Sequence, residues 1–425
     1  MIRDLLHELK WRGMLNDSTP GLYEHLQKGP ATGYIGFDPT ADSLHVGHLV
    51  QVMTLTHFQR CGHKPVALVG GATGMVGDPS GKRSERDLLD EEALRHNQAC
   101  VRTQLERFLD FSGTVNPARM VNNYDWFKDM GFLRFIREVG KHITVNYMMA
   151  KDSVKSRLES GLSFTEFSYQ LVQGYDFYWL NKHMDCTVQM GGSDQWGNIT
   201  TGTELIRRMG GGEAYAVTTQ LLTKADGTKF GKSEGGNVWL DAHRTSPYKF
   251  YQFWLNNSDA DAAKAARIFT TWEEGRTEDL VAQHARAPHE RRLQKELACF
   301  ITTLVHGEGE LKAAIMASDI LFGAASEGLP SLSRQQWIDA FDGVPQAEVP
   351  RTVLEAGAPI LELMTDHTGF MPSKAEAKRA LKEGSISVNK LRVDDTRSVG
   401  MADVYSGTFV LLQRGKKNYF LVKVV

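Results

Sequence analysis

The sequence has little of what marks secreted, membrane-spanning or zinc-bound proteins. Its 425 residues include four cysteines, which lie far apart and form no Cys-x-x-Cys pair. Such sparse cysteine argues against a disulfide framework or a structural zinc site, and we predict no protein-bound metal. No apolar run approaches the roughly 18 residues that a membrane span needs, and the first residues lack the apolar core of an export signal. We therefore expect a cytoplasmic protein.

The net charge is also close to zero, but the charged residues are distributed unevenly along the chain. The formal net charge is −2, yet the segment from Pro372 to Val425 holds eleven Lys and Arg against five acids. That segment therefore carries +6 and everything before it −8. A basic terminal module on an acidic body favours a polyanionic partner, with a merely solvated surface as the alternative.

The first half of the chain predicts a parallel sheet. Residues 34–37 and 65–70 are short apolar runs with glycine at or near their ends, and residues 186–190 have a similar pattern, as buried parallel strands do. Between the first two runs, residues 44–60 place apolar side chains at helical spacing. Strand, helix and strand within about forty residues form a βαβ unit, the building block of a doubly wound, Rossmann-like sheet. Such a sheet binds ligands at the carboxyl ends of its strands.

The rest of the chain predicts further modules. Residues 246–322 are almost purely helical in pattern, whereas 323–357 mix Gly, Pro and Ser and indicate a linker with little core of its own. Residues 358–425 pair a basic helix at 373–383 with short strands, which is typical of a small α+β domain. Because the chain exceeds what one hydrophobic core usually serves, we predict a separate catalytic domain at 1–245.

The most informative block covers residues 34–48. A predicted strand runs into a turn, Ser43 stands where a helix N-cap would be, and His45 and His48 follow three apart and so on one face. A helix N-terminus attracts phosphates, and Gly47 would let a flat base lie against bare backbone. Four residues are easily matched by chance, so histidines that merely decorate a helix or bind a metal stay the alternative.

A second block, the lysine loop, covers residues 223–233 and reads Thr-Lys-Ala-Asp-Gly-Thr-Lys-Phe-Gly-Lys-Ser. Gly227 and Gly231 predict mobility, and Lys229 and Lys232 can both face one anion as movable point charges. Taken alone, the block is more typical of an ordinary surface loop.

Together the two blocks resemble the paired signatures of class I aminoacyl-tRNA synthetases, their HIGH motif and their KMSKS loop. Within that class the chain is similar to the bacterial tyrosyl enzymes essentially end to end. Gly231 stands where the general class has serine, which the bacterial tyrosyl enzymes tolerate. The stretches that carry the resemblance are residues 34–40, 163–176, 191–198 and 223–233.

The resemblance implies ATP-dependent activation of L-tyrosine to tyrosyl-adenylate with release of pyrophosphate, then transfer of the tyrosyl group to the 3'-terminal adenosine of tRNA(Tyr). The substrate carboxylate itself attacks the α-phosphate, so the protein must hold both substrates in line and neutralise the charge on pyrophosphate. Mg²⁺ is expected to arrive with ATP. The positions that match this task are Thr40, His45, His48, Lys82, Arg86, Lys229 and Lys232. For Lys82 and Arg86 the alternative is solvated loop charge.

The resemblance also implies two sets of binding residues. Tyr34 and Asp176 would hydrogen-bond the phenolic hydroxyl of tyrosine, and Asp78, Tyr169 and Gln173 its ammonium group. Tyr169, Gln173 and Asp176 fall at i, i+4 and i+7, on one face of a helix; a polar face that merely meets water is the alternative. The tyrosine-binding set is completed by Gln195, near the carboxylate. The ATP-binding set is Gly36, Asp38, His45, Gly47, His48, Gly192, Asp194, Lys229, Phe230, Gly231, Lys232 and Ser233.

The C-terminal segment is similar to the S4-type RNA-binding domain of bacterial tyrosyl enzymes, which implies tRNA(Tyr) as partner. Its basic positions are Lys374, Lys378, Arg379, Lys382 and Lys390, and Lys151, Arg207 and Arg208 match positions that contact the acceptor stem. By the same resemblance, the aromatic-rich segment 126–149 would form the surface of a homodimer.

Three other interpretations stay open at this point. Activation of tryptophan is disfavoured by the pair of Tyr34 and Asp176 and by the S4-like domain. A nucleotidyltransferase that uses only the His-x-Gly-His block leaves the lysine loop and the basic segment unexplained. An RNA-binding protein on an inactive scaffold would have no need of His45, His48, Lys229 and Lys232.

Overall fold

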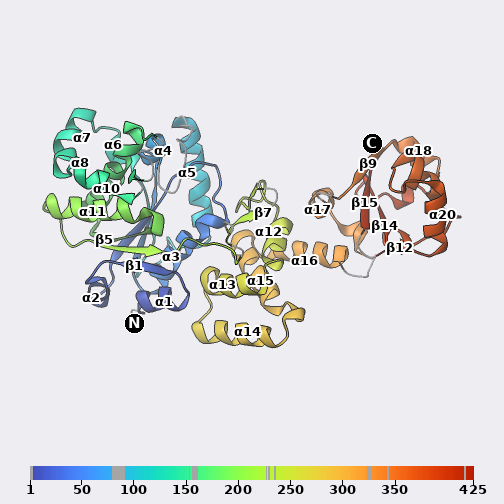
Figure 1. Ribbon diagram of the computed structural model, residues 1–425, viewed down its shortest axis with the longest axis horizontal. Coiled ribbons are helices and arrows are strands. Elements are labelled where there is room, and N and C mark those ends of the chain that lie inside the picture. Colours follow the sequence, from blue (N-terminus) through green and yellow to red (C-terminus); the bar gives the residue numbers. More distant parts are fainter. Residues whose placement is uncertain are drawn as a thin grey trace. The chain divides into compact units, whose positions relative to one another are not determined.

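The computed structural model describes residues 3–78, 91–152, 154–155, 161–225, 227, 230–233, 236–322, 328–341, 344–415 and 418–425 (Figure 1). For residues 232–233 and 320–322 it describes the backbone alone. The chain divides into two compact units. The first comprises Met1–Thr245 and Phe253–Val305, and the second Ser246–Gln252 and His306–Val425. In the part of the chain that the structure describes, no helix is both long and apolar enough to cross a membrane.

The first unit contains one six-stranded sheet and the helices around it. Its strands are β1 (Leu15–Ser18), β2 (Thr32–Phe37), β3 (Lys64–Val69), β4 (Arg119–Asn122), β5 (Cys186–Gly192) and β6 (Tyr215–Thr219), with a small hairpin of β7 (Lys232–Ser233) and β8 (Gly236–Asn237). Its α-helices are α1 (Leu5–Trp11), α2 (Leu22–Gln27), α3 (Leu49–Arg60), α4 (Thr73–Val76), α5 (Glu91–Leu105), α6 (Tyr124–Phe127), α7 (Phe132–Glu138), α8 (Val145–Met149), α10 (Phe164–Met184), α11 (Trp196–Arg208), α13 (Asp259–Phe269), α14 (Glu274–Arg286) and α15 (Arg292–His306). Its 3₁₀ turns are η1 (Val46–His48), η2 (Gly140–His142), η3 (Ser193–Gln195) and η4 (Pro288–Glu290).

The order of the strands confirms the doubly wound parallel sheet. It runs β1-β6-β5-β2-β3-β4, with all neighbours parallel except β1, which is antiparallel to β6. From β2 the chain winds outward through β3 to β4 and then returns to β5 on the other side of β2. Such a switch point opens a crevice beyond the carboxyl ends of the two adjacent strands, where ligands bind in sheets of this kind.

The alternation along β2 explains how both faces of the sheet are covered. Tyr34 packs in an apolar cluster with Phe177 and Leu180 of α10. On the opposite face, Gly33 lies so close to Phe58 of α3 that a Cβ there would sit 2.7 Å from the ring. Successive residues of a strand point to opposite faces, so one strand meets helices on both.

The helix predicted over 44–60 begins later than the sequence indicated. Val46–His48 forms the 3₁₀ turn η1, and regular α-helix starts at Leu49. The N-cap is His45 and not Ser43: His45 Nδ1 accepts a hydrogen bond from the Gly47 N–H at 3.0 Å, while the Ser43 hydroxyl is turned to the carbonyl oxygen of Leu44. A 3₁₀ turn has three residues, so His45 and His48 still share one side, with their ring centroids 3.9 Å apart.

The second unit is built on a five-stranded sheet of order β12-β11-β14-β15-β9. Its strands are β9 (Gln346–Val349), β11 (Ile386–Val388), β12 (Leu391–Arg392), β14 (Phe409–Arg414) and β15 (Asn418–Val424), with β10 (Ala358–Pro359) and β13 (Ser398–Val399) paired separately. Its helices are α12 (Pro247–Leu255, which continues into the first unit), α16 (Glu308–Phe322), α17 (Arg334–Ala340), α18 (Arg351–Glu355), α19 (Ile360–Glu362) and α20 (Lys374–Lys382), and its short turns are η5 (Leu329–Ser331), η6 (Leu363–His367) and η7 (Met401–Asp403).

The predicted linker over 323–357 is corrected by this unit. β9 pairs in parallel with β15, from Gln346 beside Leu421 to Val349 beside Val424. Trp337 of α17 is fully buried, with its ring centroid 5.6 Å from that of Phe409. The composition of 323–357 is rich in Gly, Pro and Ser, but a few well-spaced apolar residues join a core that the other strands supply.

The predicted helical segment 246–322 is helical, but it is not one body. Residues Phe253–Val305 belong to the unit of the parallel sheet, and the flanking residues to the other unit. Arg12 of α1 helps to hold residues Phe253–Val305 in the first unit. Its guanidinium donates to the carbonyl oxygens of Arg267, Thr270 and Trp272 at 2.5, 2.8 and 2.7 Å. A sequence pattern gives helices but not such long-range hydrogen bonds.

Candidate active site

A cavity of about 310 Å³ lies at the carboxyl ends of β2 and β5, where the topology places a ligand crevice. Other positions that line it and that sequence reasoning left out include Thr73, Gln189 and Leu221. The predicted site residues that line it are Tyr34, Gly36, Asp38, Thr40, Gly47, His48, Asp78, Tyr169, Gln173, Asp176, Gly192, Asp194 and Gln195. The whole predicted tyrosine-binding set is therefore brought to one place.

Helix α10 presents three of these residues, as its spacing predicted. Tyr169, Gln173 and Asp176 all line the cavity. The helix begins with a capping box, in which the Ser163 hydroxyl accepts from the Glu166 N–H and the Glu166 carboxylate accepts from the Ser163 N–H. This exchange satisfies N–H groups that a helix start otherwise leaves unpaired, and so fixes where the helix begins.

One end of the cavity holds two buried oxygen groups on facing elements. The hydroxyl of Tyr34, on β2, is buried and has no hydrogen-bond partner among the described residues. Asp176, on α10, is 1% exposed. Burial, and then the nearby Asp176, raises the pKa of Tyr34 well above its ordinary value, so the phenol stays protonated. A buried hydroxyl without a partner is rare and marks a place for a polar ligand atom.

The carboxyl of Asp176 is held by two side chains that follow β4. Asn123 Nδ2 donates to one oxygen at 3.1 Å, and Trp126 Nε1 donates to the other at 2.9 Å. Burial raises the pKa of Asp176 to about 8, although both hydrogen bonds act in the opposite direction. Sequence reasoning missed both donors, because nothing in a segment some fifty residues away along the chain marks them as neighbours of Asp176.

The same network continues to the other side of the cavity. Asn123 also donates to the Thr73 hydroxyl at 3.1 Å, and Thr73 donates to Asp38 at 2.8 Å. The hydroxyl of Tyr169 donates to the second oxygen of Asp38 at 3.0 Å. Because Tyr169 uses its proton on Asp38, its oxygen is oriented as an acceptor toward the cavity.

A second set of hydrogen bonds orients the amide side chains. Gln195 Nε2 donates to Asp78 at 2.8 Å. Asn198 Nδ2 donates to the side-chain oxygens of Gln173 and Gln195, both at 3.1 Å. Asp78, Tyr169 and Gln173 thus each present an oxygen acceptor, which is what an ammonium group needs.

The described lining is acidic. Asp38, Asp78, Asp176 and Asp194 all face the cavity, and the part of the lining that the structure describes includes no Lys or Arg. Burial, and then Asp78, raises the pKa of Asp194. The arrangement of the described lining suits an ammonium group. The cations predicted to meet phosphates are Lys82, Arg86, Lys229 and Lys232. Of those, Lys82, Arg86 and Lys229 lie outside the described residues, as do the side chains of Lys232 and Ser233.

The two signature blocks meet at their glycines. Gly231 has a φ of +86°, and a Cβ there would lie 2.9 Å from the backbone nitrogen of Gly47. Both the positive φ and the close approach require glycine, which explains why serine does not fit here. His45 does not line the cavity itself, but its ring stacks on that of His48, which does. Phe230, predicted to bind ATP, has a buried ring that packs against Trp254 and Phe269, with ring centroids 5.9 and 5.6 Å away.

Comparison with known proteins agrees with this geometry. Residues 26–323 match the family model of class I tRNA synthetases for tryptophan and tyrosine, and residues 336–422 that of the C-terminal domain of SYY-like tyrosine–tRNA ligases. A tyrosine–tRNA ligase of Porphyromonas gingivalis is 57% identical over 99% of this chain and 100% of its own length. One from Flavobacterium johnsoniae is 57% identical over the full length of both chains.

The chain belongs to the tyrosine–tRNA ligase family of class I tRNA synthetases.

Solved structures place the fold in the same family. A C-terminally truncated mitochondrial tyrosyl-tRNA synthetase of Aspergillus nidulans aligns with a TM-score of 0.68 and 28% identity, over 75% of this chain and 94% of that one. A tryptophanyl-tRNA synthetase of Plasmodium falciparum aligns with a TM-score of 0.51 and 12% identity, over 79% of this chain and 88% of that one. The latter likeness concerns the fold alone, so tyrosine–tRNA ligases are the relatives that inform the site.

The three predicted acceptor-stem residues of this tyrosine–tRNA ligase family member are engaged within the protein. Lys151 donates to the Tyr147 hydroxyl at 2.8 Å and to Thr200 Oγ1 at 3.0 Å. Arg207 and Arg208 share the carboxylate of Glu204, whose pKa falls to about 2 because of the bond from Arg207 and the second from Arg208. Arg207 stays 69% exposed and so can still meet a phosphate.

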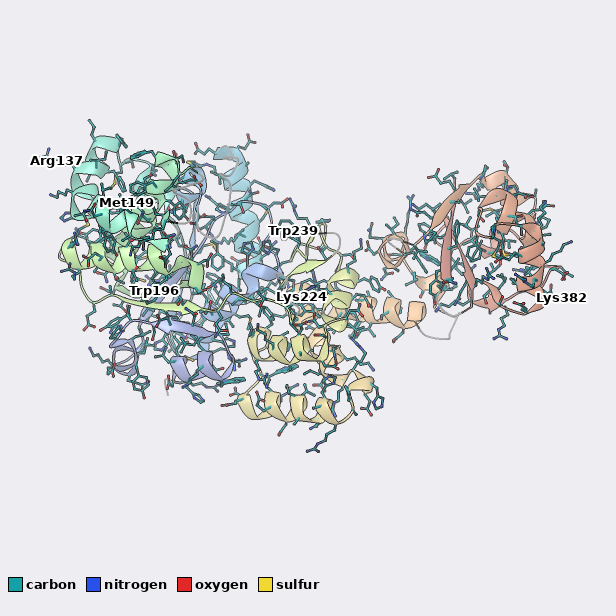
Figure 2. The ribbon with its side chains drawn as sticks, viewed as in Figure 1. Arg137, Met149, Trp196, Lys224, Trp239 and Lys382 are labelled. Carbon is teal, nitrogen blue, oxygen red and sulfur yellow. The ribbon has the colours of Figure 1, made fainter. Side chains whose placement is uncertain are left out.

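The basic residues predicted for RNA lie on α20 and the following turn. Lys374 pairs with Asp366 at 2.7 Å, whereas Lys378, Arg379 and Lys382 are exposed (Figure 2 labels Lys382). Asn389 and Lys390 have φ of +49° and +66° and form the two-residue turn between β11 and β12. Two successive positive φ values are the mark of a type I′ hairpin turn.

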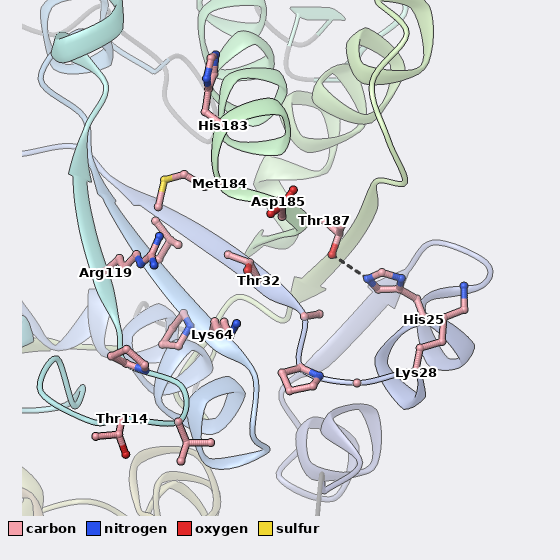
Figure 3. Close-up of a pocket in the computed structure, with 17 residues that line it drawn as sticks. His25, Lys28, Thr32, Lys64, Thr114, Arg119, His183, Met184, Asp185 and Thr187 are labelled. Atoms are coloured by element: carbon pink, nitrogen blue, oxygen red, sulfur yellow. Dashed lines mark hydrogen bonds between the residues drawn. The ribbon is translucent and has the colours of Figure 1, made fainter.

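A larger hollow, of about 660 Å³, lies at the opposite edge of the sheet, near the amino ends of β2, β3 and β5 (Figure 3). Lys64, Arg119 and His183 are among its lining residues, and His25 beside it is hydrogen-bonded to Thr187 at 2.8 Å. No predicted site residue among those described lines this hollow. Size alone therefore does not identify the site; the carboxyl-edge cavity holds the convergent polar groups.

Proposed function

We propose that the protein activates L-tyrosine with ATP and transfers the tyrosyl group to the 3'-terminal adenosine of tRNA(Tyr). In the first step a tyrosine carboxylate oxygen bonds to the α-phosphorus while the bond to pyrophosphate breaks. In the second, a terminal hydroxyl of tRNA attacks the activated carbonyl and AMP leaves. The observation that carries the proposal is the hydroxyl of Tyr34, which is buried without a hydrogen-bond partner among the described residues, in the cavity that Asp176 also lines.

Recognition of the phenol follows from that pair. Tyr34 can donate to the substrate hydroxyl, and Asp176 can take part from α10, held in place by Asn123 and Trp126. A site built to hydrogen-bond a hydroxyl rejects an analogue that lacks it, because buried polar groups are then left unpaired; tyrosine activation is the usual example of this rule. Tryptophan, with an N–H donor and a larger ring, matches the pair less well.

The rest of the cavity suits the other substrate groups. Asp78, Tyr169 and Gln173 would accept from the ammonium group, with Gln195 near the carboxylate. Asp38, Thr40, His48 and Asp194, with backbone at Gly36, Gly47 and Gly192, would hold ATP. Lys82, Arg86, Lys229 and Lys232 would neutralise charge on the pyrophosphate, with Mg²⁺ bound to ATP as part of the substrate, and His45 would act from beside His48.

Binding of tRNA is proposed for the second unit, as an S4-like domain, with the acceptor end reaching Lys151, Arg207 and Arg208. The exposed residues Lys378, Arg379 and Lys382 would contact phosphates. Replacing all three with alanine should weaken tRNA binding and lower the slope of log affinity against log salt by about two to three. The matched control is R334A with R351A, two exposed arginines of the same unit that lie on α17 and α18 and not on α20. An unchanged slope in the triple variant would place the RNA elsewhere.

A homodimer through segment 126–149 is proposed on the apolar side chains that it exposes. Phe132, Leu133 and Val145 are 63, 80 and 63% exposed, and Phe164, the first residue of α10, is 67% exposed. Several large exposed apolar residues in one segment are typical of an interaction surface. Sedimentation at micromolar concentration should give the mass of two chains for the wild type and of one for L133E; a monomeric wild type would remove the proposal.

The domain boundaries proposed from the sequence are 1–245, 246–322, 323–357 and 358–425, with the linker shortened by the elements described above. A cytoplasmic location stays a prediction.

The test of the reaction is ATP–pyrophosphate exchange with tyrosine, phenylalanine and tryptophan in parallel. Exchange with tyrosine alone supports both reaction and pocket. Exchange with tryptophan keeps the class and overturns the assignment of Tyr34 and Asp176. Absence of exchange with all three favours an RNA-binding protein on an inactive scaffold.

A further inference from the structure

We propose that Trp239, held by Arg244 and Asp42, is a positioning residue for His45 and that it couples the lysine loop to the His45–His48 pair. The inference rests on the proposed function, because it concerns the step in which the two signature blocks act together. It assigns a task to residues 238–244, which sequence reasoning left without one. Figure 2 labels Trp239.

The backbone of this region connects the two blocks. The crossover segment, residues 238–241, follows the hairpin of β7 and β8, in which Lys232 pairs with Asn237. The Val238 N–H donates to the carbonyl oxygen of Gly231 at 3.0 Å, and the Val46 N–H donates to that of Val238 at 2.9 Å. One residue is thus hydrogen-bonded to the lysine loop and to η1. A displacement of the loop therefore reaches the start of α3 through two bonds.

A second set of bonds fixes the crossover segment against the turn before His45. The Leu240 N–H donates to the carbonyl oxygen of Leu44 at 2.9 Å, and the Asp241 N–H donates to the hydroxyl of Ser43 at 3.1 Å. The backbone N–H of Trp239 itself donates to Thr245 Oγ1 at 2.9 Å. His45 and Trp239 form an antiparallel bridge between these segments. The backbone of Trp239 is therefore fixed relative to that of His45.

The side chains complete the connection. The ring of Trp239 meets that of His45 edge to face, with centroids 5.6 Å apart at 73°. His48 stacks on His45 at 3.9 Å. Because His45 Nδ1 accepts from the Gly47 N–H, the neutral ring carries its proton on Nε2. Trp239 and His48 together limit where that ring can turn.

Trp239 is held in turn by a charged pair. The guanidinium of Arg244 lies over its ring, 4.7 Å from the centroid, and forms an ion pair with Asp42. Asp42 precedes His45 by three residues. The series of contacts from Asp42 through Arg244 and Trp239 to His45 therefore begins and ends in the same short segment of the chain. A cation over an aromatic face is worth enough to orient the ring but little for global stability at an exposed site.

The test measures the rate of tyrosyl-adenylate formation at saturating tyrosine and ATP, together with the dissociation constant of tyrosine. We expect W239L to lower the rate by about tenfold and R244Q by about threefold, with tyrosine affinity unchanged within about twofold. W239F keeps an edge-to-face ring and should stay within about threefold of wild type. R276Q is the matched control: Arg276 lies over Trp272 at 4.8 Å in the same unit, and its loss should leave the rate unchanged.

A double-mutant cycle separates positioning from general packing. If Trp239 acts through His45, W239L should have almost no further effect on the rate in an H45A background. Full effect of W239L in that background, equal loss of rate and tyrosine affinity, or a wild-type rate in W239L would each overturn the inference. If the wild type shows no tyrosine-dependent exchange, the proposed function fails first. An active wild type with an unaffected W239L removes only the role of Trp239.

Discussion

At the scale of single residues, the Tyr34 hydroxyl couples stability to recognition. It is buried without a partner among the described residues, and such a group destabilises a protein by roughly 1–3 kcal/mol. The same group gains a partner when a phenol enters the cavity. Binding of tyrosine therefore gains a hydrogen bond at Tyr34 that phenylalanine, which lacks the hydroxyl, cannot form.

Y34F should accordingly move two quantities in opposite directions. Without tyrosine, the free energy of unfolding should rise by about 1 kcal/mol, because the unpaired hydroxyl is removed. In pyrophosphate exchange, kcat/KM for tyrosine should fall by about fivefold while that for phenylalanine stays level, because one neutral hydrogen bond is lost. Urea unfolding and exchange with both amino acids measure these. Y23F, at a tyrosine that is 49% exposed, should change neither. A less stable Y34F would mean that the hydroxyl is already paired in the free protein.

D176N should change how stability depends on pH. Burial raises the pKa of Asp176 from 3.8 to about 8, so between these values the folded protein holds a proton that the unfolded chain releases. The wild type therefore loses stability relative to D176N as pH rises from about 4 to about 8, by at most ~1.4 kcal/mol per pH unit. Urea unfolding of both proteins across that range, without ligands, measures the difference. A constant difference would mean that Asn123 and Trp126 keep the carboxylate ionised.

At the scale of elements, sequence and structure agree where a pattern is local. The apolar run of β2 and the spacing of Tyr169, Gln173 and Asp176 are patterns within one element, and both were predicted from the sequence. Asn123 is different: it meets Asp176 only because β4 lies beside β3 and α10 covers that face. Its place depends on strand order, which no short-range pattern contains.

The predictions for the start of α3 and for residues 323–357 were wrong for related reasons. Ser43 is a good N-cap residue, but its hydroxyl is taken by Leu44 and Gln104, so the cap passes to His45. Residues 346–349 have weak apolar character and become a strand only because β15 offers a free edge. In both cases a tertiary partner outweighs local preference.

The docking of α1 depends on Arg12, whose side chain is fully buried. Its guanidinium bonds to Glu8 and to three carbonyl oxygens at and after the end of α13. R12M should lower the free energy of unfolding by about 3–5 kcal/mol, since it removes the charged partner of the Glu8 carboxylate and the donor to three carbonyl oxygens. R3M is the control: Arg3 pairs with Glu273, but both are more than half exposed, so less than about 1 kcal/mol should be lost. Similar losses in both variants would show that Arg12 has no special role.

At the scale of the whole molecule, the charge asymmetry lies mainly within the second unit. The first unit carries a net charge of only −2 and holds the cavity for an ammonium-bearing substrate, whereas in the second unit residues 306–371 carry −7 and the basic C-terminal segment, with the exposed cations for RNA, carries +6. The sequence predicted this asymmetry by counting charges. The boundary between the two units could not be predicted by counting charges, because it depends on which strands pair.

The boundary between the two units can be tested with two truncated chains. Residues 1–327 end before η5 and α17, whereas residues 1–355 keep Trp337 and β9 but lack β14 and β15, against which they pack. We expect 1–327 to retain tyrosine-dependent pyrophosphate exchange within about threefold of the full chain, and to lose at least about a hundredfold in kcat/KM for tRNA charging, because phosphate contacts supply much of RNA affinity. The longer chain should aggregate, since a buried tryptophan and an unpaired strand edge become exposed. Exchange, charging and size-exclusion chromatography of both chains measure this. Loss of exchange together with charging in 1–327 would mean that the second unit is part of the fold on which the active site depends.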